Sequence, residues 1–184
     1  QLSITVDTIA PTITITSDKT ALKSGETATI TFTLSEPAST ALISSNITVV
    51  GGTLSTLTPG SGNTYTAIFT PTNNSTTAAT FNVLANTFTD GAGNPNTVSN
   101  TISITVDTVA PTITIASNKT TLNIGETANL TFTLSESSST FAIGDVTATG
   151  GTLGTLSGSG TSYTAIFTPT ATSTTTATIN VLAN

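Results

Sequence analysis

Carboxylates are the side chains of this sequence that could do chemistry, because most other reactive groups are missing. The chain has 184 residues, with nine Asp or Glu and three Lys or Arg, and it contains no His, Cys, Met or Trp. Mechanisms of the serine- and cysteine-hydrolase type need a His base, and zinc or haem sites need His, Cys or Met ligands. The remaining options are binding of a hard cation by oxygen ligands and acid–base work by paired carboxylates.

The candidate oxygen ligands fall in two groups, one in each half of the chain. In chain order they are Asp7, Glu36, Asp90 and Asn94, followed by Asp107, Glu136 and Asp145. No Lys or Arg lies near them in the sequence, and no stretch has the ligand spacing of an EF-hand. The net charge of −6 offers no basic surface for nucleic acid, and no apolar run approaches membrane-spanning length. We therefore expect neither nucleic-acid binding nor membrane insertion.

The two groups arise because the chain contains two copies of one module. The segment LSITVDTIAPTITITSDKT at 2–20 returns as ISITVDTVAPTITIASNKT at 102–120, and TYTAIFTPT at 64–72 returns as SYTAIFTPT at 162–170. The offset falls from 100 to 98 residues between these matches, and the two lost residues lie in turn-rich strings. Length changes confined to loops are typical of a folded module repeated in tandem.

Each module reads as an all-β sandwich. In residues 27–35 apolar side chains alternate with Thr, which is the pattern of a strand with one buried face. Turn-forming Gly, Pro, Asn and Asp separate such runs. The strands expected in the first module are 12–17, 27–35, 46–50, 53–58, 64–70, 79–88 and 99–106. This pattern predicts two tandem immunoglobulin-like antiparallel β-sandwiches joined by a short, Pro-containing link, as in a stiff rod.

The alternation of strands also predicts where the acids meet. If the strand at 12–17 leaves one pole of the module, the loops that contain Glu36 and Asp90 return to that pole, next to Asp7. Three carboxylates without a neighbouring cation repel one another, so we expect a calcium ion there, with Asn94 adding an amide oxygen. The alternative is that these residues are ordinary turn formers. A glycosidase pair made of Glu36 and Asp90 is disfavoured because the chain has no Trp platform for sugar.

The strings VDTxAPT, FTLSE, GGTL, YTAxFTPT and FTDGAGN occur in order. Together they resemble the bacterial Ig-like repeats of giant surface adhesins over essentially the whole chain. The resemblance implies an extracellular, non-enzymatic stalk module of adhesion or biofilm proteins, in which calcium at module junctions often stiffens the fibre.

The second module ends at TATINVLAN, where the first continues into its last strand. Residues 2–7 (LSITVD) copy that last strand, ISITVD at 102–107, ahead of any module that they could complete. We therefore expect Leu2, Ile4 and Val6 to fill the last-strand position of a neighbouring module, either by strand donation between copies in a head-to-tail filament or as covalent continuation of a longer repeat protein.

The resulting domain assignment has three parts: residues 1–8 as a strand of a neighbouring module, 9–107 as the first module, and 108–184 as the second module without its last strand. The predicted function is a structural repeat of an extracellular fibre or adhesin stalk at the cell surface, whose partners are copies of itself or adjacent Ig-like modules. The alternative is a carbohydrate- or ligand-binding accessory module. Asn73 and Asn74, in a predicted loop, are the best placed of the N-glycosylation sequons.

Overall fold

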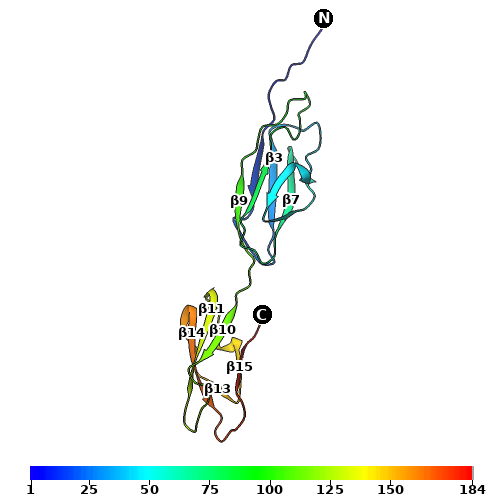
Figure 1. Cartoon of the computed structure of the whole chain (residues 1–184). Coiled ribbons are helices and arrows are strands. Elements are labelled where there is room, and N and C mark those ends of the chain that lie inside the picture. Colours follow the sequence, from blue (N-terminus) through cyan, green and yellow to red (C-terminus); the bar gives the residue numbers. More distant parts are fainter. Residues whose placement is uncertain (184) are drawn as a thin grey trace. The chain divides into compact units, whose positions relative to one another are not determined.

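A computed structural model of the chain describes residues 1–183 as two compact units (Figure 1). Unit 1 is Gln1–Ala110 and unit 2 is Pro111–Asn184. This division lies close to the predicted boundary between residues 107 and 108.

Unit 1 contains two sheets of the immunoglobulin type. The first has the order β1 (Ile13–Ser17), β3 (Ala28–Leu34), β7 (Thr64–Pro71) and β5 (Gly52–Leu54), and β6 (Thr58–Pro59) also pairs with β7. The second has the order β2 (Ala21–Lys23), β9 (Ile102–Asp107), β8 (Ala79–Val83) and β4 (Ile47–Val50), which is preceded by the 3₁₀ turn η1 (Ser44–Asn46). All neighbouring strands are antiparallel except β2 and β9, which are parallel. The predicted fold class is confirmed.

The alternation of Thr and apolar residues explains why these strands form a sandwich. Along β3, the side chains of Ala28, Ile30, Phe32 and Leu34 are buried, and the intervening Thr side chains are at least partly exposed. Apolar side chains from both sheets therefore meet in one core. Phe69 of β7 and Phe81 of β8 pack edge to face across it, with ring centroids 4.8 Å apart.

Unit 2 repeats four of the five strands of the first sheet and two of the four strands of the second. The first sheet has the order β10 (Ile113–Ser117), β11 (Ala128–Ser138), β14 (Ser157–Pro169) and β13 (Gly151–Leu153). The second sheet consists of β12 (Val146–Thr149), which follows the 3₁₀ turn η2 (Ile143–Asp145), and β15 (Thr178–Val181). Within residues 111–183 no strand corresponds to β9, and residues 121–123, the sequence counterpart of β2, are not in a strand.

The core of unit 2 is more open on the side of this two-stranded sheet. Phe81 and Val83 of β8 have zero exposure, whereas their counterparts Ile179 and Val181 on β15 are only partly buried. Likewise, Leu22 is buried in unit 1, and its counterpart Leu122 is only partly buried. In unit 1 the strand that covers these positions is β9, whose Ile104 and Val106 are buried.

Four strand assignments differ from the prediction: β2 was not predicted, the strand predicted at 99–106 begins at Ile102, and two others end early or are divided. The strand predicted at 79–88 ends at Val83, because Asn86 adopts a positive φ of 62° and the chain turns into a loop. The strand predicted at 53–58 is divided into β5 and β6. No helix among residues 1–183 is long and apolar enough to cross a membrane.

Candidate metal centre

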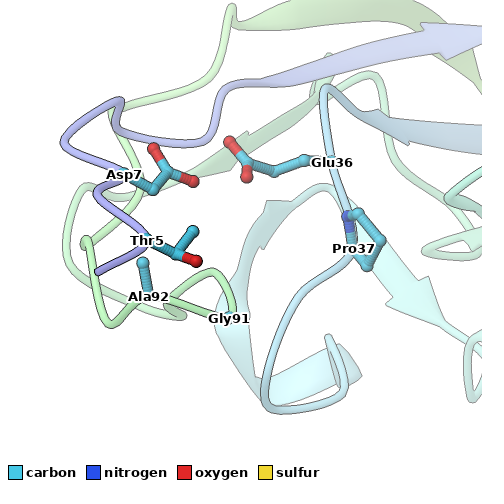
Figure 2. A pocket seen from close by; sticks show the side chains of 6 residues that line it. All are labelled: Thr5, Asp7, Glu36, Pro37, Gly91 and Ala92. Carbon is cyan, nitrogen blue, oxygen red and sulfur yellow. The ribbon is translucent and has the colours of Figure 1, made fainter. Parts of the chain in front are cut away.

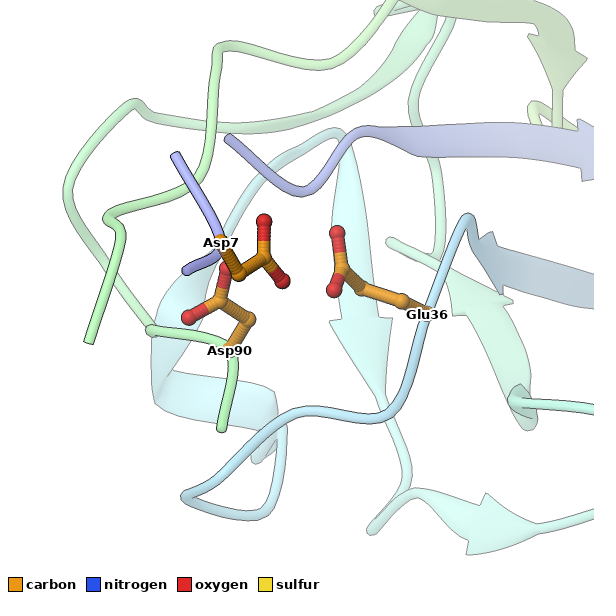
Figure 3. A group of neighbouring side chains, drawn as sticks. All are labelled: Asp7, Glu36 and Asp90. Atoms are coloured by element: carbon orange, nitrogen blue, oxygen red, sulfur yellow. The ribbon is translucent and has the colours of Figure 1, made fainter. Parts of the chain in front are cut away.

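Three carboxylates predicted to converge lie together at one pole of unit 1 (Figure 3). Asp7 precedes β1, Glu36 follows β3, and Asp90 lies in the loop after β8. One oxygen atom from each carboxylate lies within 4.8 Å of the others. We call these three residues the acidic cluster.

Asp90 is the anchored member of the acidic cluster. Its side chain is 1% exposed, and it accepts hydrogen bonds from the backbone N–H of Ala92 at 2.9 Å and of Asn94 at 2.8 Å. The Asn94 side-chain amide donates a third bond, at 2.8 Å. Burial alone would raise the pKa of Asp90, but these hydrogen bonds outweigh it and hold the pKa below its ordinary value. Asp90 therefore remains ionised at neutral pH.

Asn94 connects the Asp90 loop to the segment before β1. Its amide nitrogen donates to the backbone carbonyl of Asp7 at 3.1 Å as well as to the Asp90 carboxylate. The side chain thus acts as a hydrogen-bond donor that positions both acids. These bonds use the amide nitrogen, so the role of the amide oxygen as a ligand stays a prediction.

Glu36 faces Asp7 across a shallow depression at the surface (Figure 2). The depression is lined by Thr5, Asp7, Glu36, Pro37, Gly91 and Ala92. Partial burial, followed by repulsion from Asp90 and then Asp7, raises the pKa of the Glu36 carboxyl. The energetic cost of placing a third negative charge at this pole therefore falls on Glu36.

The acidic cluster fits a hard divalent cation by its donor chemistry. Calcium takes six to eight oxygen ligands, including carboxylates in monodentate or bidentate mode. Within residues 1–183 the one ion pair joins Lys119 to Glu126 at 3.1 Å, so it compensates none of the charge of the acidic cluster. A bound cation would supply the missing positive charge.

Two of the three acids of the second group accept local backbone hydrogen bonds. Asp107, in unit 1, accepts a bond from the Val109 N–H at 3.2 Å, as Asp7 does from the Ile9 N–H at 3.0 Å. Asp145 accepts a bond from the Ala142 N–H at 2.9 Å and so stabilises η2 in unit 2. Glu136 is exposed on β11.

The other predicted site residues lie on the surface. Leu2, Ile4 and Val6 are 87%, 76% and 76% exposed, in a segment that runs out from unit 1 ahead of β1 (Figure 1). Asn73 and Asn74 are exposed in the turn between β7 and β8, where Asn74 has a φ of 54°.

Sequence reasoning missed Asn96, a buried polar residue that organises the loop carrying Asp90. Its side-chain oxygen accepts bonds from the N–H groups of Thr87 at 2.7 Å and Phe88 at 3.0 Å. Its amide donates to the carbonyls of Leu84 and Thr97 at 2.9 Å and 2.8 Å. Nothing in the string GNPN distinguishes Asn96 from an ordinary turn residue, so the sequence held no signal for this role.

Comparisons with known proteins give one domain match and several similar solved structures. The bacterial Ig-like domain matches residues 7–106 and again residues 107–184. No curated protein matches the chain. Among solved structures, the chain is similar to FdeC, an Escherichia coli adhesin, at 19% identity and a TM-score of 0.44, covering 86% of this chain and 55% of that one. It is also similar to the Yersinia pseudotuberculosis adhesin InvE at 17% identity and a TM-score of 0.40, covering 85% of this chain and 50% of that one.

The chain spans about half the length of these two structures. The domain match, by contrast, extends over both units and nearly every residue. It agrees with the two-sheet topology and with the repeated strings from which the fold was predicted. The chain belongs to the bacterial Ig-like domain family.

Proposed function

We propose that this chain is a non-enzymatic structural repeat of an extracellular fibre or adhesin stalk at the cell surface. The observation that carries the proposal is the direct succession of two Ig-like units. β9, the last strand of unit 1, ends at Asp107, and β10, the first strand of unit 2, begins at Ile113, with Pro111 in the connection. A short connection that contains Pro restricts the backbone far more than a flexible tether would.

End-to-end continuation is part of the same proposal. Residues 2–7 precede β1 as residues 102–107 precede β10, and the connecting strings VDTIAPT and VDTVAPT differ in one residue. A module placed ahead of unit 1 would therefore meet it through the same kind of connection. Residues 2–7 would be its last strand, whether donated by this chain or continuous with it.

Mechanical unfolding of single molecules tests the stalk role. Each unit should unfold as a separate event, and each event should lengthen the chain by about 3.6 Å for every residue released. The alternative function is that of a carbohydrate- or ligand-binding accessory module. Binding to a glycan array tests this alternative. Saturable binding to a defined glycan, together with unfolding at negligible force, would favour the alternative.

We also propose that the acidic cluster binds calcium. The supporting observation is the convergence of three carboxylates from three separate segments of unit 1, at a pole where partial burial and the other two acids raise the pKa of Glu36. Such a site would fix the segment before β1 against the loops that follow β3 and β8. Thermal unfolding in calcium, in magnesium and in EDTA tests it, and we expect unit 1 to melt at a higher temperature in calcium.

A further inference from the structure

The open sheet of unit 2 matches the N-terminal segment of the same chain. Resting on the stalk role proposed above, we propose that residues 2–8 of a second copy complete this sheet by pairing antiparallel with β15 and parallel with residues 121–123. The chains would thereby join head to tail without a covalent bond.

The receiving edge lies on β15. One edge of β15 pairs with β12, as β8 pairs with β4 in unit 1. The other edge of β8 pairs with β9, and within residues 111–183 no strand takes that place beside β15. On this side Ile179 and Val181 are partly exposed, so an added strand would bury apolar surface and satisfy backbone groups at once.

The donated strand is identified by its sequence. Residues 2–7 differ from β9 in one position, where Leu2 replaces Ile102. In β9 the side chains at the second and third apolar positions, Ile104 and Val106, are buried. Their copies Ile4 and Val6 are each 76% exposed, so they are free to enter a core elsewhere. Strand addition of this kind combines backbone pairing with pockets for alternate side chains.

The register follows from unit 1. β8 and β9 pair Ala79 with Ile104, Thr80 with Ser103 and Phe81 with Ile102. Transferred to unit 2, this register sets Ala177 opposite Ile4, Thr178 opposite Ser3 and Ile179 opposite Leu2. The parallel pairing of Leu22 with Val106 likewise sets Leu122 beside Val6. A slip by one residue would turn Ile4 and Val6 out of the core, so the register is strongly specified.

A polar anchor fixes the end of the donated strand. In unit 1 the buried Thr108 receives a bond from the Ser75 N–H at 2.9 Å, and its hydroxyl donates to the Thr72 carbonyl at 2.7 Å. Thr8 copies Thr108, and Thr170 and Ser173 copy Thr72 and Ser75. The receiving turn already has the same local form in unit 2. The Thr170 N–H donates to Gly150 at 2.9 Å, as the Thr72 N–H donates to Gly51.

The contact uses different surfaces on the two copies, the N-terminal segment of one and the β15 edge of the next. A heterologous contact of this kind leaves one donor and one receiver free at the ends of every oligomer. Assembly therefore continues and yields filaments, as opposed to closed dimers.

Engineered cysteines test the register, because the natural chain has none. Directly opposite residues of antiparallel strands have Cα atoms about 4.5–5.5 Å apart, within the range of a disulfide, whereas diagonal neighbours are about 7–8 Å apart. We expect the double variant Ser3→Cys with Thr178→Cys to form a disulfide ladder of dimers, trimers and longer species on non-reducing gels. The matched control, Ser3→Cys with Asn180→Cys, keeps the same outward face but is displaced by two residues, and should give at least tenfold less ladder.

Point variants in the exposed segment test the assembly itself. Ile4→Asp places a charge at an inward position of the donated strand and should convert filaments into monomers in electron micrographs and in ultracentrifugation. Ser3→Asp, its outward-facing neighbour, should leave the filaments intact. A wild-type chain that stays monomeric at high concentration, filaments that survive Ile4→Asp, equal ladders from both cysteine pairs, or a disulfide confined to monomers would each overturn the proposal.

Failure of this proposal and failure of the stalk role give different results. The Ile4→Asp chain is a monomer by design, so its two units can be unfolded mechanically without any strand donation. If this monomer resists force and the wild-type chain does not assemble, the stalk role is supported and strand donation between copies is wrong. If the wild-type chain assembles but its units unfold at negligible force, strand donation is supported and the stalk role is wrong.

Discussion

The three carboxylates at the pole of unit 1 differ in the cost of their charge. Asp90 accepts three hydrogen bonds, which lower its pKa, whereas Glu36 is partly desolvated and repelled by two neighbouring acids, which raise its pKa. A bound cation would therefore stabilise the Glu36 carboxylate more than the Asp90 carboxylate. Replacing Glu36 distinguishes the effect of repulsion among the acids from the effect of losing a cation ligand.

Glu36→Gln should shift thermal stability in opposite directions with and without calcium. In EDTA at pH 7 the variant removes one of three repelling charges, so unit 1 should melt at a higher temperature than the wild type. In millimolar calcium the wild type should gain stability, and the variant should gain much less because it has lost a ligand. Differential scanning calorimetry measures both. Glu26→Gln, which removes an acid outside the acidic cluster, is the control and should respond to calcium as the wild type does.

The pH dependence of stability follows from the same two pKa shifts. Because the pKa of Glu36 is raised on folding, the folded state holds its proton more tightly than the unfolded state. In EDTA the contribution of Glu36 to the free energy of unfolding should therefore weaken as the pH rises above about 4.3 and through the pKa of the folded state. Asp90 has the opposite sign, so stability should also be lost as the pH falls below about 3.9. Denaturation by urea between pH 3 and 7 checks this, and calcium should remove the loss due to Glu36. A flat profile above pH 4.3 in EDTA would contradict the strain assigned to Glu36.

Asn96 bonds to four backbone groups around the loop that carries Asp90. Asn96→Ala would leave the buried N–H of Phe88 and the partly buried N–H of Thr87 and carbonyl of Leu84 without their partner. We expect a loss of about 3 kcal/mol in the free energy of unfolding of unit 1 and a weaker calcium response. Chemical denaturation measures the first and calorimetry the second. Asn73→Ala, at an exposed turn position, should change neither.

At the scale of secondary structure, the sequence was informative wherever Thr alternated with apolar residues. The predicted strands at 12–17, 27–35 and 64–70 lie within a residue or two of β1, β3 and β7. The prediction failed between Leu84 and Phe88, where the alternation of apolar and polar residues continues but the backbone is no longer a strand. The chain turns at Asn86, and the N–H groups of Thr87 and Phe88 then bond to the side chain of Asn96, a tertiary partner that no local pattern shows. In the same way, antiparallel topology predicted that the three acids meet, but not that Asn94 would act as a donor.

The repeated string GGTL has a backbone explanation at this scale. A Cβ atom on Gly52 would overlap the carbonyl of Thr70 and the ring of Phe69, so β5 can approach β7 only without a side chain there. Gly52→Ala should destabilise unit 1 by about 1–3 kcal/mol, measured by urea denaturation. Gly91→Ala, where nothing lies within 4 Å of the added Cβ, is the matched control. Equal effects of the two substitutions would contradict the steric explanation.

For the whole molecule, the difference between the units predicts two melting transitions. In a monomeric chain such as Ile4→Asp, unit 2 should unfold at the lower temperature. Several apolar residues of unit 2 are partly exposed, whereas the residues at the same positions in unit 1 are buried. A peptide of residues 1–8, added in excess, should raise this lower transition and leave the upper one unchanged. Calorimetry, with the Ile4→Asp peptide as control, checks the expectation. A single transition, insensitive to the peptide, would show that unit 2 is as stable as unit 1 without an added strand.

The near identity of residues 2–7 and β9 also creates a problem of strand exchange. A free segment from another copy has almost the same contacts to offer unit 1 as β9 itself, so the two compete for one place. The outcome is decided by effective concentration, since β9 is tethered to the unit that it completes and samples it at the equivalent of about millimolar concentration. Free segments at micromolar concentration are therefore outcompeted by mass action. The covalent link of β9 to unit 1 thus keeps free segments out of that unit and leaves them to pair with unit 2, although both units would accept the same sequence.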